Sequence, residues 1–255
     1  MTPGEKIEAY AAIADELCAR IEGFAAHGNE ALKLSGYKLT VRDHVTIGLV
    51  LKIDSSFRAF LVDARAQRTE ALHHLKTMVE AYVYILVVSK DESDRTAEGL
   101  LCRVYEAKEK FYRLNPVYDL DGGLLRLAHK TLAELTRTEG TVAVGDVGPE
   151  AHKHSPGLGQ WYDQVYRSAC EPAHVTDLIE FMEPFQFKTD PEITIGNVHN
   201  APSRVATATD QGLQLMFNLA RFVSDNVLKL SLDVADLEQR AIAIRSEPTT
   251  YTAEK

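Results

Sequence analysis

Apolar residues recur every three or four positions in the stretch LHHLKTMVEAYVYILVV (Leu72–Val88). This spacing predicts a helix that turns one face toward a core, because a helix has 3.6 residues per turn. The predicted core-facing stripe consists of Leu72, Leu75, Val79, Tyr82, Val83 and Leu86.

The helical pattern continues on the N-terminal side of this stretch. The residues TVRD (Thr40–Asp43) are typical of a capping box, in which the Thr40 side chain accepts a hydrogen bond from a first-turn amide. From there to Lys90 only Gly48 interrupts the pattern, and one unbroken helix would be about 75 Å long. A compact domain cannot hold such a helix, so we predict a break, either at residues 54–56 (DSS) or at residues 63–67 (DARAQ).

The remaining chain predicts further helices and few other elements. Glycine and proline indicate a loop over residues 140–159, and residues 185–202 form a short non-helical insertion that could hold an extended strand or a lid. We therefore predict an all-α bundle of about 7–9 helices in a single domain, residues 1–245, followed by a disordered tail, residues 246–255. The other predicted helices span residues 3–28, 93–116, 122–139, 161–170, 172–183, 203–230 and 233–245.

Composition limits the possible partners. The chain has 255 residues and a net charge of −9, from 28 basic and 37 acidic residues. Phosphate affinity comes mainly from Lys and Arg, so we expect no general DNA binding, and any RNA contact would be a local site. The longest apolar run, residues 81–88, is too short to span a bilayer. Three widely spaced cysteines and a polar, acidic opening (MTPGEKIEAY) favour a cytoplasmic protein with reduced thiols.

A candidate site lies in WYDQVYRSACEPAH (Trp161–His174). Helical spacing places Asp163, Arg167 and His174 along one edge, but Pro172 disfavours a continuous helix. We expect one helix to end near Cys170 and a new turn to begin at Pro172, where free backbone amides favour an anion and a neutral imidazole. The alternative is an Asp163–Arg167 surface ion pair beside a partly buried histidine.

The apolar stretch also contains polar residues with two possible roles. Lys76 and Glu80 form either an i,i+4 pair that stabilises the helix, or part of a site in which Glu80 is a buried carboxylate that orients Arg167 or His174. His152 and His154 in the predicted loop are either solvated or metal ligands, and two histidines alone favour the former. The chain has no P-loop and no GxGxxG, GxSxG or HExxH motif, so we expect no cofactor and no metal.

Residues 52–91 and 161–174 together resemble an uncharacterised bacterial all-helical family whose own function is unsettled. The resemblance matches Lys76, Glu80 and Asp91 to the family pattern, although the family more often has Arg where this chain has Lys76. It also favours the helix break at residues 63–67. The later segment is similar to the family's Tyr-Arg segment that ends in His, here Tyr166, Arg167 and His174.

The Arg167–His174 pair is also distantly similar to the Arg and His motif of HEPN-type domains, although its six intervening residues are at the long limit of that pattern. Many such domains are metal-independent endoribonucleases of toxin–antitoxin and phage-defence systems, and they usually act as dimers. This resemblance implies that His174 is a general base or acid, that Arg167 stabilises the phosphorane, and that Tyr166 and Glu80 support them. A non-catalytic binding module for an anion or a protein, and a purely structural role, remain open as alternatives.

Overall fold

The structure is a computed structural model, and it describes residues 1–135, 142–170, 202–228 and 230–250. These residues form nine α-helices and no strand, which confirms the predicted all-α fold. None of the described helices is long and apolar enough to cross a membrane. The α-helices are α1 (Pro3–Ser35), α2 (Val41–Arg65), α3 (Ala71–Ser89), α4 (Arg95–Leu114), α5 (Gly123–Leu135), α6 (Val147–His154), α7 (Pro156–Cys170), α9 (Pro202–Phe222) and α10 (Ala235–Ser246).

Several helix boundaries follow from local sequence signals. The Thr40 amide donates to the Asp43 carboxylate at 2.8 Å and the Asp43 amide donates to the Thr40 hydroxyl at 3.2 Å, so the predicted capping box starts α2. The break after α2 lies at the second of the two predicted positions, where Gln67 has a φ of 53°. A second capping box, formed by Thr2 and Glu5, starts α1.

Other boundaries differ from the prediction. α1 runs through Gly28 and ends only at Gly36, whose φ of 66° suits a residue without a side chain. The predicted helix over residues 203–230 is interrupted, because α9 ends at Phe222 and a π-helical segment, Val223–Leu228, follows it. The predicted loop over residues 140–159 is wrong, since it contains α6 and the first turn of α7.

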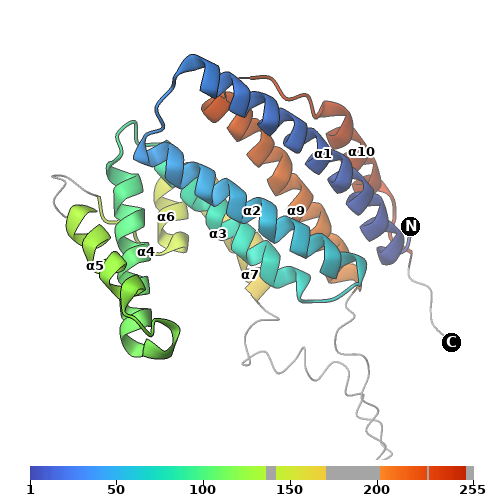
Figure 1. The fold of residues 1–255 in the computed structure, drawn as a ribbon. Coiled ribbons are helices and arrows are strands. Elements are labelled where there is room, and N and C mark those ends of the chain that lie inside the picture. Colours follow the sequence, from blue (N-terminus) through green and yellow to red (C-terminus); the bar gives the residue numbers. More distant parts are fainter. Residues whose placement is uncertain (136–141, 171–201, 229, 251–255) are drawn as a thin grey trace, which may run out of the picture. The chain divides into compact units, whose positions relative to one another are not determined.

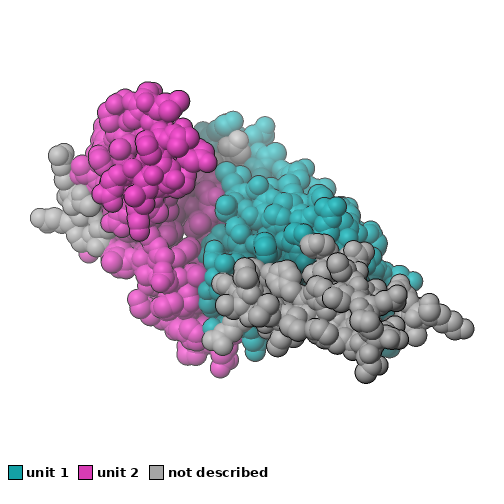
Figure 2. Space-filling view, turned by 90° about the horizontal axis from the view of Figure 1, so that it is seen from below, with its two compact units in different colours: residues 1–37, 50–82, 161–255 teal, residues 38–49, 83–160 magenta. Residues whose placement is uncertain are grey.

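The described residues divide into two compact units, which are coloured separately in Figure 2. Unit 1 comprises residues 1–37, 50–82 and 161–255, and unit 2 comprises residues 38–49 and 83–160. The division into compact units does not test the predicted single domain, residues 1–245, which stays a prediction.

Unit 1 is built around a large apolar core. α1 lies beside both α9 and α10 (Figure 1). α9 closely approaches α2 and α3 at Gly212, where an added Cβ would lie 3.3 Å from the Phe60 ring and 3.8 Å from a Leu75 methyl. Close packing of this kind explains why the largest side chains of the unit are excluded from water. Those below 2% exposure include Phe57, Phe60, Ile7, Ile13, Leu17, Ile53, Leu75, Met78, Leu213, Leu215, Met216 and Leu237.

The end of the chain differs from the predicted tail. Ser246 is the last residue of α10, and the next residues bond to the start of the chain. Lys6 Nζ donates to the Glu247 carbonyl at 2.6 Å, and the Thr250 amide donates to the Met1 carbonyl at 2.9 Å. Residues 246–250 are therefore held by the N-terminal segment, while residues 251–255 lie outside the described residues.

Unit 2 has a smaller core and one helical hairpin. Its core cluster joins α2, α3, α4 and the segment before α6 through Val45, Val88, Ala97, Leu100 and Val144. Beyond this cluster α4 and α5 pack side by side as an antiparallel hairpin, with a 3₁₀ turn, η1 (Pro116–Tyr118), between them (Figure 1).

Candidate functional site

The two segments predicted to form one site lie on α3 and α7. Lys76 and Glu80 are one turn apart on α3, and Asp163 and Tyr166 are on α7. All four belong to unit 1, so their arrangement is defined within one compact unit.

A cation and an aromatic ring connect the two helices. Lys76 Nζ lies 5.3 Å from the centroid of the Tyr166 ring, which is within the range of a cation–π interaction. The Tyr166 ring stacks in turn on Tyr162, with centroids 4.5 Å apart and planes inclined by 20°. Because Tyr162 is buried, the stack anchors one side of the Tyr166 ring that the ammonium of Lys76 contacts. A positive charge is thus held next to the helical turn that carries Arg167.

A second pair of aromatic rings also joins α3 to α7. Tyr82 on α3 meets Trp161 on α7 edge to face, with centroids 5.9 Å apart. Burial raises the pKa of the Tyr82 phenol, an effect that the positive charge of Arg221 partly opposes. The Tyr82 side chain therefore contributes a neutral, mainly apolar surface that carries one hydroxyl group.

Lys76 and Glu80 are not joined by an ion pair in the described part of the chain, so the first of their two possible roles is not seen there. Lys76 extends toward Tyr166 instead, and no ion pair or hydrogen bond joins Glu80 to the described residues. Glu80 is half-buried, one turn after Lys76 along α3. Its predicted role toward Arg167 or His174 stays a prediction, because the side chain of Arg167 and all of His174 lie outside the described residues.

The chain around Pro172 is described only in part. α7 extends to Cys170, and Asp163 is half-buried one turn before Arg167 on that helix. The helix keeps the i,i+4 spacing of Asp163 and Arg167 that the sequence predicted. Residues 171–174, including Pro172 and His174, lie outside the described residues, so the predicted new turn stays a prediction.

Asp91, the third residue of the family-like pattern, contacts the start of a helix. Its carboxylate accepts hydrogen bonds from the Ser93 amide and hydroxyl, at 2.9 and 2.7 Å, and from the Thr96 amide and hydroxyl, at 3.1 and 2.7 Å. These donors hold the pKa of Asp91 well below its ordinary value. Asp91 precedes Asp94, the N-cap residue of α4, and binds the first turn of that helix through Thr96, which gives it a structural role in unit 2 that the sequence pattern alone did not assign.

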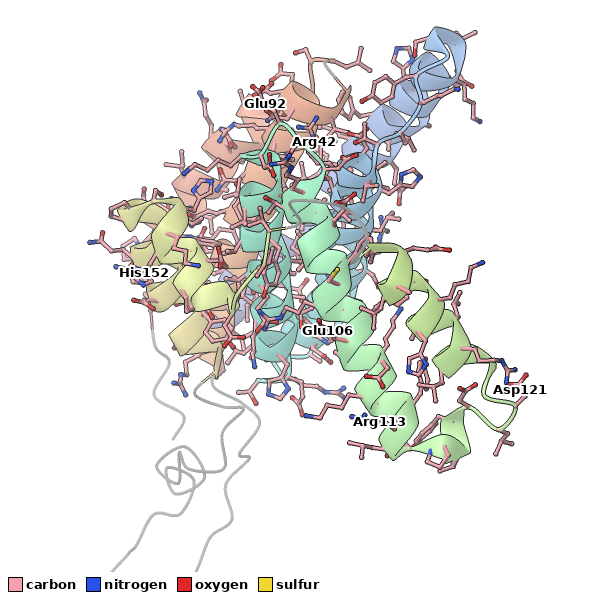
Figure 3. The ribbon with its side chains drawn as sticks, turned by 90° about the vertical axis from the view of Figure 1, so that its left-hand side faces the viewer. Arg42, Glu92, Glu106, Arg113, Asp121 and His152 are labelled. Carbon is pink, nitrogen blue, oxygen red and sulfur yellow. The ribbon has the colours of Figure 1, made fainter. Side chains whose placement is uncertain are left out.

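The two histidines assigned to a loop lie on α6, where Figure 3 labels His152. Burial and the nearby charge of Lys90 lower the pKa of His154, and its Nδ1 atom is buried without a hydrogen-bond partner. Within the part of the chain that the structure describes, no group of three His, Cys, Asp or Glu residues is placed to hold a metal ion.

Two surface pockets in unit 1 were not anticipated from the sequence. One, of about 310 Å³, lies between α1 and α2 above the buried thiol of Cys18, whose pKa burial raises to about 11. Two ion pairs between the helices line this pocket. Arg58 pairs with Glu22 at 2.7 Å, and Arg65 pairs with Asp15 at 2.5 Å. The other, of about 270 Å³, is lined by α1, α9 and α10. Neither is lined by a predicted site residue.

Comparisons with known proteins add no further assignment. No protein-family model, no curated protein and no solved structure matched this chain. The helical architecture agrees with the expected helical domain, and the similarity to HEPN-type domains stays an expectation based on Arg167, His174 and their surroundings.

Proposed function

We propose that the face formed by α3 and α7 binds RNA and cleaves it without a metal ion, with Arg167 and His174 as catalytic residues. The observation that supports this proposal is the contact between Lys76 and Tyr166. The two segments were assigned to one site from sequence alone, and this contact joins them in space.

The described residues supply features that an RNA site needs. Lys76 offers a positive charge for a phosphate group, and the half-buried rings of Tyr82 and Trp161 are of the kind on which bases stack. Because the whole chain carries a net charge of −9, affinity for RNA requires a local concentration of basic groups. Arg167 adds a second cation one residue after Tyr166.

The proposed reaction is an internal transesterification. His174 takes the proton of a ribose 2′-hydroxyl, and the 2′-oxygen forms a bond to the adjacent phosphorus. Arg167 stabilises the negative charge of the phosphorane. The bond from phosphorus to the 5′-oxygen then breaks, and that oxygen takes up a proton from the imidazolium. The products are a 2′,3′-cyclic phosphate and a 5′-hydroxyl.

The test is cleavage of single-stranded RNA in EDTA, with the new ends identified by mass spectrometry. We expect Arg167→Ala and His174→Ala each to lower the rate by about 100-fold or more. His27→Ala and Arg95→Ala change exposed residues elsewhere and should cleave at the wild-type rate. Equal rates in all five proteins, or no cleavage at any protein concentration, would exclude the reaction.

A non-catalytic anion-binding module is the second candidate, because the fixed position of Lys76 over Tyr166 can hold a phosphate without help from His174. This alternative predicts RNA binding that Lys76→Gln weakens, ligand-dependent melting temperatures that His174→Ala alters, and no turnover. A homodimer with paired motifs and a role in phage defence belong to the ribonuclease proposal, since they derive from the HEPN resemblance, and the cytoplasmic location expected from the cysteines is proposed with them.

A further inference from the structure

The hairpin of α4, η1 and α5 exposes an unusual amount of apolar surface. Of the 15 large apolar side chains that are exposed among the described residues, eight lie between residues 104 and 127. Soluble proteins rarely leave such a concentration uncovered unless it binds something. The eight are Val104, Phe111, Leu114, Val117, Tyr118, Leu120, Leu124 and Leu127.

The apolar residues of α4 follow a heptad pattern. Six apolar residues follow one another at spacings of three, four, three, four and three: Ala97, Leu100, Val104, Ala107, Phe111 and Leu114. The first two pack into the core of unit 2. The last four continue along the same stripe into solvent, with exposed fractions of 47% for Phe111 and 65% for Leu114. A stripe this narrow is the pattern by which one helix pairs with another. We call these four residues the α4 seam: Val104, Ala107, Phe111 and Leu114.

The positions that flank the α4 seam are basic. Lys108 follows Ala107, and Lys110 precedes Phe111 on the other side of the stripe, and both are exposed. Arg103 holds the position equivalent to Lys110 one heptad earlier, but it is ion-paired with Asp146, so Lys108 and Lys110 supply the flanking charge. The acidic residue Glu106 lies off the stripe, on the same side of α4 as Arg113, and Figure 3 labels both. Charges at these flanking positions determine which helix a coiled coil accepts.

We propose that the α4 seam is a docking surface for an amphipathic helix of another protein, with acidic residues at the positions that flank its own apolar stripe. A second copy of this chain does not fit, because antiparallel pairing would place Lys108 opposite Lys108 and Lys110 opposite Lys110. Parallel pairing would place Arg103 beside Lys108. Like charges in such positions disfavour pairing, whereas carboxylates there would form ion pairs with the flanking lysines.

The experiment measures the affinity of the full chain for two synthetic helical peptides by fluorescence anisotropy. Both peptides have four heptads with leucine at the a and d positions, and they differ only in glutamate or lysine at the e and g positions. We expect the glutamate peptide to bind at least about tenfold more tightly than the lysine peptide. Lys108→Glu with Lys110→Glu should reverse this preference. Lys33→Glu with Lys52→Glu makes the same change of charge at exposed sites outside the hairpin and should bind as the wild type does.

A second variant, Phe111→Ser with Leu114→Ser, tests the apolar part of the surface. Because both side chains are exposed, the variant should fold with unchanged circular dichroism and lose binding of both peptides. Equal affinity of the wild type for the two peptides, or no binding of either, would overturn the proposal. Two other results would also overturn the proposal if neither peptide binds. One is that the wild type forms a homodimer that the serine variant does not form, and the other is that the wild type binds phosphatidylserine vesicles and the serine variant does not.

Discussion

The consecutive helices α3 and α4 differ in how they meet solvent. On α3, apolar side chains are buried around most of the circumference, including Leu75, Met78, Val79, Val83 and Ile85. On α4, the buried apolar residues are confined to the first two turns, and the same stripe continues into solvent. The difference shows that a helical apolar pattern identifies the face that can pack, but only the surrounding helices determine whether it does.

The comparison predicts its largest effect in the core. Leu75→Ala removes a side chain with no exposure beside Gly212, so we expect it to lower the free energy of unfolding by about 3 kcal/mol. Leu114→Ala makes the same chemical change where the side chain is 65% exposed, and should change it by less than about 0.5 kcal/mol. Urea denaturation of both variants measures the two values, and similar losses would mean that α4 packs as α3 does.

A smaller effect on stability is expected where the first half of α4 packs against the segment around Val142. A Cβ on Gly99 would lie 1.7 Å from the Val142 carbonyl oxygen, so Gly99→Ala must displace backbone. We expect this change to lower the free energy of unfolding by about 2 kcal/mol. The control is Gly48→Ala on α2, where nothing lies within 4 Å and a better helix former should raise stability by about 0.5–1 kcal/mol. Equal melting temperatures for the two variants would contradict the close approach at Gly99.

The start of α4 should show a still smaller effect, and one that depends on pH. Asp91→Ala removes the acceptor of the first-turn Thr96 amide and hydroxyl and should lower the free energy of unfolding by about 1–2 kcal/mol at pH 7. Because the folded-state pKa of Asp91 lies below its unfolded value, this acceptor contributes fully above about pH 4, and the contribution is lost as the pH falls through the folded-state value. The difference in melting temperature from the wild type should therefore shrink on acidification, whereas the exposed Glu92→Ala should show none at pH 7.

How much the sequence could predict differs between these helices for physical reasons. Signals within one or two turns were sufficient for the capping box at Thr40 and for the break near Gln67. The segment 140–159 was misassigned because its glycines and prolines have other uses. Pro156 is the first residue of α7, and Gly159 leaves room for the His152 ring, 2.3 Å from where a Cβ would be.

The candidate site was predictable only as a set of residues. The sequence indicated that Lys76 lies one turn before Glu80 on a helix, and the resemblance placed Lys76 and Tyr166 in the two matching segments. That Lys76 would leave Glu80 for the Tyr166 ring depends on the packing of α7 against α3, which no local pattern contains. Asp91 was included in the same pattern, but its carboxylate accepts hydrogen bonds from Ser93 and Thr96 and so stabilises the start of α4.

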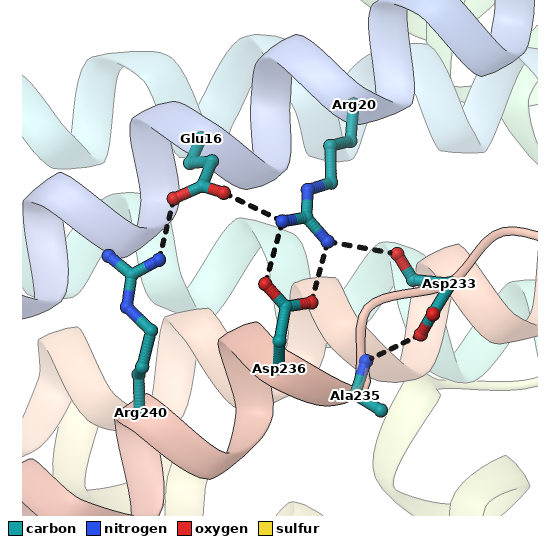
Figure 4. Close-up of polar contacts among 6 residues, drawn as sticks. All are labelled: Glu16, Arg20, Asp233, Ala235, Asp236 and Arg240. Carbon is teal, nitrogen blue, oxygen red and sulfur yellow. Dashed lines mark hydrogen bonds and ion pairs between the residues drawn. The ribbon is translucent and has the colours of Figure 1, made fainter.

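The smallest effect is expected on the outer surface of unit 1, where ion pairs join α1 to α10. Arg20 donates to both oxygens of Asp236 at 2.7 Å and to Glu16 at 2.7 Å, and Arg240 donates to the other oxygen of Glu16 at 2.6 Å (Figure 4). These side chains are between 30% and 54% exposed, and such surface pairs contribute little because water and salt screen them. α10 is held mainly by the buried side chains of Leu237 and Ala241.

Asp236→Asn should therefore lower the melting temperature only slightly at low salt, with Glu8→Gln on the exposed face of α1 as the control. Hydrogen bonds from Arg20 lower the pKa of Asp236, so the pair contributes above the unfolded-state pKa and loses its contribution as the pH falls through the folded-state value. The deficit should vanish in 1 M salt, where the screening length is about 3 Å, and on acidification. A large deficit that persists in both conditions would mean that charges, and not Leu237 and Ala241, hold α10 on α1. Apolar packing would then not explain why α10 is held on α1 while the α4 seam is left exposed.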